Sequence, residues 1–267
     1  MLKGIGACLI DLDGTVFQGD RLIRGADRAI AALRASGRKI VFVSNRGNLS
    51  RTQGVEKLRK AGIEAEKDEL LLASTAAARL LKSHYPNASV WTLGDPGLGE
   101  ELADHGIRLS AAPETADWLV VSLHETLTYG DLNDAFQAVR HGARIMATNL
   151  DRTFPKDGKQ AIDVAGMAGA IEAASGRRVE IVVGKPSYYM GEAALAAAGL
   201  PGEQCAMIGD SLESDIGLGK AHGMRTVLVM TGSTDTAMLE KAERRPDFVI
   251  ESLADLEHMA EYEEDAS

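Results

Sequence analysis

The stretch CLIDLDGTVF, residues 8–17, constrains the fold more strongly than any other part of the chain. An apolar run that begins at Ile5 stops abruptly at Asp11 and Asp13, which precede Gly14. A short apolar run that ends in turn residues predicts a buried strand followed by a loop. Doubly wound α/β sheets bind ligands outside the carboxyl ends of their strands, so both carboxylates are expected in a binding crevice.

Asp11 and Asp13 are separated by one residue, so their charges repel each other unless they share a cation or a proton. The pair therefore indicates a bound metal, a raised pKa, or both. An ordinary Asp-Gly turn is the alternative that this stretch alone leaves open.

Three later stretches repeat the arrangement of an apolar run that ends in polar residues. The first of them supplies the Ser44 hydroxyl, Asn45 and successive backbone N–H groups, which suit a phosphate. Arg46 either adds a guanidinium to this anion site or points to solvent, and a polar turn is the alternative for the whole stretch. The three stretches are VFVSNRGN at 41–48, VVGKPS at 182–187 and AMIGDSLESD at 206–215.

The last two stretches provide charges of opposite sign. Lys185 lies between a glycine and a proline that restrict its position, and it offers a compact positive charge for a phosphoryl site. Asp210 follows an apolar run, and Asp215 comes five residues later near the expected start of a helix. Both carboxylates are therefore predicted to point at one metal ion.

In this order, the four stretches resemble the haloacid dehalogenase superfamily of aspartate-nucleophile phosphohydrolases, over residues 7 to about 250. Within it, the chain is similar to the subfamily of NagD-type nucleotidases and 4-nitrophenyl phosphatases, and most similar to sugar phosphatases. The stretches that carry this closer similarity are DLDGTVF, VSNRGN, LHETLTY, ATNLDRTFP, DVAGMAGAIE and GDSLESDI. The resemblance implies an α/β fold with a doubly wound, Rossmann-like parallel sheet and an inserted smaller α/β cap domain.

The resemblance also implies a role for each polar residue of the four stretches. Asp11 acts as the nucleophile that forms an aspartyl phosphate, and Asp13 acts as the general acid and base. The expected cofactor is Mg²⁺, held by the Asp11 carboxylate, the Asp13 carbonyl and the Asp210 carboxylate, with Asp215 orienting a bound water. The groups expected to bind the transferring phosphoryl oxygens are Ser44, Asn45 and Lys185.

The chain changes character at two places, which predicts an insertion. An alanine-rich segment over 68–83, expected to be helical, ends at HYPNAS. The stretch 84–181 then alternates apolar runs with amphipathic segments, as an α/β layer does. We expect a core of 1–83 and 182–267, with 84–181 as a cap that excludes water and selects the leaving alcohol.

Several cap residues are candidates for substrate contacts. ATNLDRTFP places Asn149 and Asp151 at the end of an expected strand, where an Asx-rich turn is the alternative. Asp163 stands where relatives often have a Pro-Gly pair and is a candidate specificity residue. His124 and Glu125 in LHETLTY either contact substrate or lead into a helix.

Composition limits the partners and the compartment. A net charge of −10 without a basic cluster argues against nucleic-acid binding. No apolar run approaches a membrane span, and the early first strand leaves no room for a signal peptide, which predicts a cytoplasmic protein. The resembled fold implies that Cys8 and Cys205 lie on neighbouring strands, where a disulfide is conceivable, but two buried free thiols are expected. A homo-oligomer through the cap is a further expectation from the resemblance.

The sequence thus predicts a Mg²⁺-dependent phosphatase for small-molecule phosphate esters, with sugar phosphates favoured and broad specificity expected. Only 4% of residues are aromatic, which makes a dedicated base-stacking pocket less favourable. A nucleoside monophosphate, 4-nitrophenyl or glycerol phosphate phosphatase is the main alternative. A phosphotransferase or a phosphate-binding regulator remains as a different class.

Overall fold

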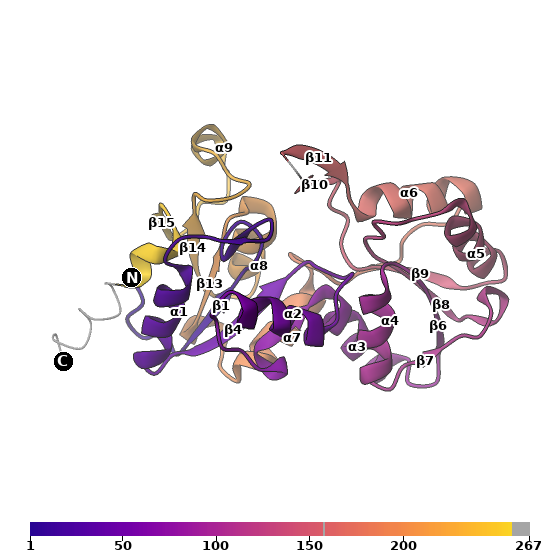
Figure 1. The fold of residues 1–267 in the computed structure, drawn as a ribbon, viewed down its shortest axis with the longest axis horizontal. Coiled ribbons are helices and arrows are strands. Elements are labelled where there is room, and N and C mark those ends of the chain that lie inside the picture. The colour runs from indigo at the N-terminus through magenta and orange to yellow at the C-terminus, as the bar shows by residue number, and fades with distance from the viewer. Residues whose placement is uncertain (157, 258–267) are drawn as a thin grey trace. The chain divides into compact units, whose positions relative to one another are not determined.

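The structure is a computed structural model that describes residues 1–156 and 158–257 (Figure 1). Contacts between Cα atoms divide the chain into two compact units. The first unit contains Met1–Ser44, Val55–Leu71 and the chain from Lys185 onward, and the second contains Asn45–Gly54 and Leu72–Gly184.

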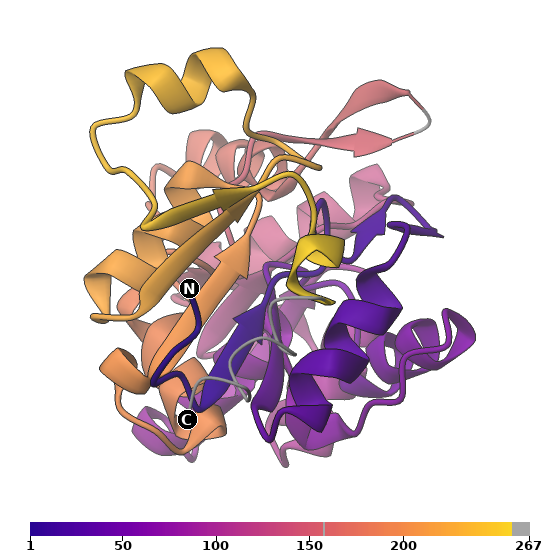
Figure 2. The same ribbon diagram turned by 90° about the vertical axis from the view of Figure 1, so that its left-hand side faces the viewer.

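The first unit is built on a six-stranded sheet in which β1 lies between β13 and β4. The registered pairs β1–β4, β1–β13, β13–β14 and β14–β15 are all parallel. Figure 2 shows helices on both sides of this sheet, so the predicted doubly wound α/β architecture is confirmed. In sheet order the strands are β15 (Phe248–Ile250), β14 (Arg225–Val229), β13 (Cys205–Gly209), β1 (Ala7–Ile10), β4 (Lys39–Ser44) and β5 (Leu70–Leu72).

The central strands of this sheet are apolar throughout because both of their faces are covered. Every residue of β1 and β13 is buried, as a parallel sheet between two helical layers requires. A short hairpin of β2 (Phe17–Gln18) and β3 (Arg21–Leu22) follows β1. The helices of this unit are α1 (Ala26–Ala35), the greater part of α2 (Arg51–Lys60), α7 (Tyr188–Ala198), α8 (Gly217–Ala221) and α9 (Thr236–Lys241).

The second unit is built on a five-stranded sheet in the order β12-β9-β8-β6-β7, with parallel pairing throughout. An antiparallel hairpin joins this sheet to α6. The strands are β6 (Ser89–Leu93), β7 (Arg108–Leu109), β8 (Trp118–Val121), β9 (Arg144–Ala147), β10 (Thr153–Lys156), β11 (Lys159–Ile162) and β12 (Ile181–Val182). The helices are α3 (Ala73–His84), α4 (Pro96–Asp104), α5 (Tyr129–Arg140) and α6 (Val164–Ser175).

The prediction of a helix over 68–83 is wrong for the first residues of that range. Leu70–Leu72 form the edge strand β5, and the helix starts at Ala73. All three leucines are buried in the sheet, so tertiary pairing overrides the helical preference of leucine.

The second unit is wider than the stretch 84–181 because neighbouring segments pack with it. It also takes in α3 and the segment 45–54. Its last strand, β12, pairs with Met146 and Ala147 of β9 and therefore belongs to the second unit. The chain returns to the first unit at Lys185.

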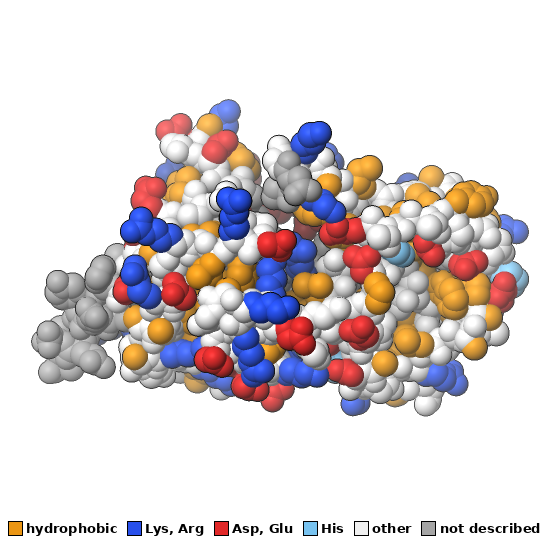
Figure 3. Space-filling view, viewed as in Figure 1, with side chains coloured by type: hydrophobic (Ala, Val, Ile, Leu, Met, Phe, Trp, Pro, Cys, Tyr) orange, Lys and Arg blue, Asp and Glu red, His pale blue; other side chains and the backbone are white. Residues whose placement is uncertain are grey.

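Charged side chains of both signs are interspersed over the face shown in Figure 3. Within the described part of the chain, no helix combines the length and apolar character needed to cross a bilayer.

Cys8 and Cys205 are free thiols on the neighbouring strands β1 and β13. Cys8 lies opposite Ala206, and Cys205 lies opposite Ala7. Because side chains alternate between the faces of a sheet, this one-residue offset directs the two thiols to opposite faces, which prevents a disulfide.

We expect neither cysteine of the native protein to react with a thiol reagent at about pH 8, because the reactive form is the thiolate. Burial raises the pKa of Cys8 to about 12, and burial also raises the pKa of Cys205. Titration with dithionitrobenzoate should therefore detect both thiols only after unfolding in guanidinium. Rapid labelling of folded protein would contradict the observed packing.

Candidate active site

The loop after β1 is held in a tight conformation by its own backbone. Leu12 accepts hydrogen bonds from the N–H groups of Val16 and Phe17, and the Gly14 N–H donates to Phe17. Gly14 has a φ of +92°, which a residue with a Cβ rarely adopts. This turn presents Asp11 directly at the end of the strand, where the Asp11 N–H donates to Ile208 of β13.

Lys185 is a buried lysine that joins two of the predicted carboxylates. Its Nζ donates to Asp11 Oδ1 at 2.5 Å and to Asp215 Oδ1 at 2.7 Å. The third donor position is used by the Val43 carbonyl at 3.0 Å. All three protons of the ammonium group are therefore committed, and the residue is only 5% exposed.

Asp210 and Asp215 approach Asp11 from the end of β13 and the helical turn that follows. Asp215 lies in a single turn of π-helix, Leu212–Ile216, and its Oδ2 accepts a hydrogen bond from the Ser211 N–H at 3.0 Å. One carboxylate oxygen from each of Asp11, Asp210 and Asp215 lies within 4.8 Å of the others. All three residues are buried, and the structure brings their carboxylates together in the first unit.

The electrostatics of this cluster follow from burial and from the balance of charges. Burial raises the pKa of Asp11 well above its ordinary value, and Asp215, Asp210 and Asp13 raise it further, while Lys185 opposes the shift. Burial and then Asp215 raise the pKa of Asp210. Burial alone would lower the pKa of Lys185, but Asp11 and Asp215 outweigh it, so this pKa is raised and the lysine stays protonated.

The donor set fits a divalent cation. Asp11 Oδ2 is buried and accepts no hydrogen bond from residues 1–156 or 158–257, although a buried carboxylate oxygen normally has a partner. Oxygen ligands alone, with carboxylates prominent, suit Mg²⁺. A cation at the cluster would satisfy the open oxygen and reduce the repulsion among the three carboxylates.

Asp13 and Ser44 lie near the ends of β1 and β4 in the first unit. Asp13 is half-buried two residues beyond Asp11, and Ser44 is the buried last residue of β4. Arg46 lies in the segment that belongs to the second unit, where its carbonyl accepts a hydrogen bond from the Ala73 N–H.

Within the second unit, the structure brings Asn45, Asn149 and Asp151 together. Asn149 Nδ2 donates to the Asn45 carbonyl at 3.0 Å, and Asn45 Nδ2 donates to Asp151 Oδ2 at 3.2 Å. The Asp151 N–H donates in turn to Asn149 Oδ1. A Cβ on Gly184 would meet Asn45 and Thr148, so this glycine permits the close packing of the cluster. Asp163 instead lies at the N-terminus of α6, where its carboxylate accepts the Val164 N–H.

Sequence reasoning did not identify Glu101, which holds the 45–54 segment against the rest of the second unit. This carboxylate is fully buried and accepts hydrogen bonds from the Arg51 guanidinium at 2.7 Å and the Arg51 N–H at 2.8 Å. Thr75 Oγ1 donates to it at 2.9 Å. A glutamate within an expected helix carries no sequence signal for such a role.

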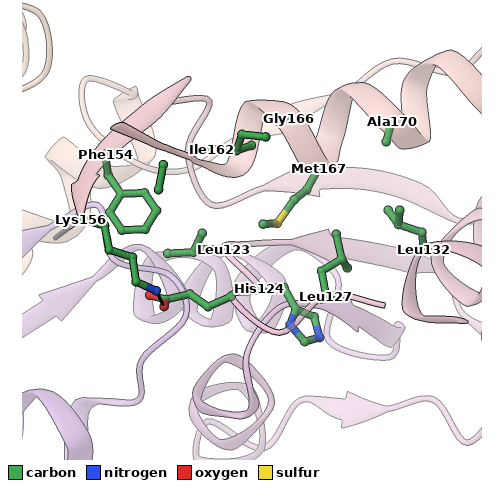
Figure 4. Close-up of a pocket in the computed structure, with 12 residues that line it drawn as sticks. Leu123, His124, Leu127, Leu132, Phe154, Lys156, Ile162, Gly166, Met167 and Ala170 are labelled. Carbon is green, nitrogen blue, oxygen red and sulfur yellow. Dashed lines mark hydrogen bonds and ion pairs between the residues drawn. The ribbon is translucent and has the colours of Figure 1, made fainter. Parts of the chain in front are cut away.

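The second unit also contains a mainly apolar cavity of about 370 Å³. Figure 4 shows Phe154 and Met167 on its walls, with Leu127 and Leu132 at the opposite end from Lys156. Lys156 forms an ion pair with Glu125. His124 and Glu125, the candidates from LHETLTY, both line this cavity, and Thr128 then caps α5.

Comparison with known proteins agrees with this arrangement. The family model described as haloacid dehalogenase-like hydrolase matches residues 8–108, and a second, described as HAD-hydrolase-like, matches residues 182–256. The sugar phosphatase AraL of Bacillus subtilis is 53% identical over 95% of this chain and 92% of its own length.

Two solved structures are also similar over nearly the whole chain. The p-nitrophenyl phosphatase from Archaeoglobus fulgidus has a TM-score of 0.89 and 35% identity, covering 96% of this chain and 99% of its own. The glycerol phosphate phosphatase from Mycobacterium tuberculosis, solved in complex with magnesium, has a TM-score of 0.86 and 30% identity. The match covers 96% of this chain and 77% of that protein's own chain.

The resemblance predicted from the four motifs is thus confirmed at the level of family and subfamily. The first family match ends at residue 108, inside the inserted stretch, and the second begins after it at residue 182, whereas the similar solved structures cover nearly the whole chain. The chain belongs to the haloacid dehalogenase-like hydrolase family and is a phosphatase.

Proposed function

We propose that this phosphatase hydrolyses small sugar phosphates with Mg²⁺, through a covalent aspartyl phosphate. The observation that carries the proposal is the buried cluster in which Lys185 holds Asp11 and Asp215 beside Asp210. The 53% identity to a sugar phosphatase supports the substrate class. The magnesium in the related glycerol phosphate phosphatase supports the metal.

In the first half of the reaction, Asp11 is the nucleophile. Its carboxylate oxygen forms a bond to phosphorus while the bond from phosphorus to the ester oxygen breaks. Asp13 gives its proton to that departing oxygen, so the product leaves as an alcohol. The position of Asp11 at the strand end supports this assignment, since Lys185 holds its Oδ1 and no donor in the described part of the chain reaches its Oδ2.

In the second half, water cleaves the aspartyl phosphate. Asp13, now a carboxylate, takes a proton from the water as its oxygen bonds to phosphorus. The bond from phosphorus to Asp11 breaks, which releases inorganic phosphate and restores both carboxyl groups to their starting states.

Mg²⁺ would be held by the carboxylates of Asp11 and Asp210 and by the Asp13 carbonyl, with Asp215 orienting a bound water. When bound, it would supply positive charge that offsets the negative charge on the transferring phosphoryl group. Lys185 supplies a second, fixed positive charge, and Ser44 and Asn45 donate hydrogen bonds to the remaining phosphoryl oxygens.

We assign the second unit as the cap, and Asn149 and Asp151 as contacts to the substrate. Their hydrogen-bond network with Asn45, one of the proposed phosphoryl ligands, supports this role. A polar cluster of amide and carboxylate groups suits the hydroxyl groups of a sugar better than an aromatic leaving group.

The proposal predicts metal-dependent phosphate release led by sugar phosphates. Inorganic phosphate should be measured from pentose phosphates, hexose phosphates, nucleoside monophosphates, glycerol phosphate and 4-nitrophenyl phosphate, with Mg²⁺ and with EDTA. We expect EDTA to abolish release and added Mg²⁺ to restore it, because the carboxylate cluster needs a cation.

Other outcomes of the same panel identify the alternatives. A preference for 4-nitrophenyl or glycerol phosphate would favour the activities named for the two structural relatives. A preference for nucleotides would favour a nucleotidase. Transfer of phosphate between sugars without release would indicate a phosphotransferase, and no turnover at all would indicate a regulator.

A further inference from the structure

We propose that the segment Thr231–Thr234, which follows β14, positions Asp210 against the Asp11 loop and thereby sets the affinity for Mg²⁺. The inference rests on the proposed function, because it concerns a ligand of the proposed metal site. The four residues are TGST in the sequence and lie outside the four motifs.

The segment holds Asp210 by both its side chain and its main chain. The Ser233 N–H donates to Asp210 Oδ2. The buried Thr234 Oγ1 donates to the Asp210 carbonyl at 2.5 Å, and Ser233 Oγ lies 3.4 Å from the same oxygen. Asp210 therefore has both its carboxylate direction and its backbone position fixed by one short segment.

The same segment is tied to the nucleophile loop. Thr231 Oγ1 donates to the Gly14 carbonyl at 2.6 Å. A Cβ on Gly14 would lie 2.6 Å from the Asp210 carboxyl carbon, and a Cβ on Gly232 would overlap the same carboxylate. The absence of a Cβ at both glycines therefore lets the Asp210 carboxylate pack closely against the nucleophile loop and against the Thr231–Thr234 segment.

The segment is itself anchored at both ends. Before it, the Met230 N–H donates to the carbonyls of Ile250 and Glu251, at the end of β15. After it, Asp235 caps α9 by accepting the Met238 N–H at 2.8 Å. A fixed segment can orient a ligand, and groups that orient ligands typically change metal affinity about 10- to 100-fold when they are altered.

Gly232→Ala and Thr234→Val test this role by two different routes. The alanine Cβ would displace the Asp210 carboxylate, and valine keeps the shape of threonine but removes the hydroxyl donor. We expect Mg²⁺ to bind Gly232→Ala about 10- to 100-fold more weakly than wild type, and Thr234→Val about 10-fold more weakly. Thr234→Ser, which keeps the donor, should restore the affinity.

Two matched controls separate positioning from a general loss of stability. Thr226 is a fully buried threonine at the other end of β14, and its hydroxyl donates to Asp247. Gly169 has open space where a Cβ would lie. Thr226→Val and Gly169→Ala should leave Mg²⁺ affinity within about twofold of wild type, even where Thr226→Val lowers the midpoint of thermal unfolding.

The measurement is isothermal titration calorimetry of Mg²⁺ into the full-length, metal-free protein, with circular dichroism to verify that each variant is folded. Should Gly232→Ala not fold, Thr234→Val and its serine rescue decide the matter. Mg²⁺ affinities of the folded variants that match wild type would overturn the inference alone. A wild-type chain that binds no Mg²⁺ would overturn the proposed function as well.

Discussion

The Asp11→Asn variant is expected to release no measurable phosphate from any ester. An amide cannot form the acyl phosphate, and loss of a nucleophile typically costs at least about 10⁴-fold in turnover. The variant should still fold, because Lys185 keeps Asp215 and the Val43 carbonyl as partners. Phosphate release at saturating substrate is the measurement, and turnover within tenfold of wild type would contradict the covalent mechanism.

Asp13→Ala provides the matched comparison for this prediction. If Asp13 contributes only its carbonyl to the metal, the alanine variant should bind Mg²⁺ as wild type does and yet lose turnover. Unchanged turnover would exclude Asp13 as the general acid and base. The two variants together separate bond formation at phosphorus from proton transfer.

Lys185→Met should impair both folding and catalysis. Removing one partner from a buried ion pair leaves uncompensated charge, at a cost of about 3–5 kcal/mol in unfolding free energy. The groups left without their positive partner are Asp11 and Asp215, which are both buried and both within 2.7 Å of the ammonium group. Turnover should fall by about 10²- to 10³-fold, the effect of losing one fixed charge or donor at a developing anion.

The sign of the pH dependence follows from the raised pKa of Lys185. A lysine whose folded pKa exceeds its unfolded value of about 10.4 contributes all of its stability below that pH. The contribution is lost only as the pH rises through the folded pKa. Urea unfolding at about pH 7.5 therefore measures the whole effect.

Lys220→Met is the control for this second prediction. Lys220 pairs with Asp247 at 2.5 Å, but both side chains are more than a third exposed, so its loss should cost at most about 1 kcal/mol. Similar unfolding free energies for the Lys185 and Lys220 variants, measured in EDTA, would mean that the buried cluster does not stabilise the fold.

The sequence predicted the carboxylate cluster because local chemistry and sheet geometry point the same way. Asp11 and Asp210 each end an apolar run, and parallel strands end at the same edge of a sheet. A buried group of carboxylates also needs a nearby positive charge, which Lys185 supplies by pairing with Asp11 and Asp215. Polar residues at strand ends can be predicted from the sequence because the apolar pattern of each strand shows where the strand ends.

Other parts of the fold depend on contacts between residues far apart in sequence. Leu70–Leu72 form a strand rather than the start of a helix because they complete the sheet. Glu101 is fully buried because it meets Arg51 and Thr75. No local pattern contains such partners.

The sequence by itself determined the family, the order of the motifs and the carboxylates that converge at the ends of β1 and β13. Only the tertiary structure decided that the 45–54 segment packs with the second unit and that Thr231–Thr234 hold Asp210. The physical reason is that a motif is defined by its own residues, whereas a supporting contact is defined by a partner brought close only when the chain folds.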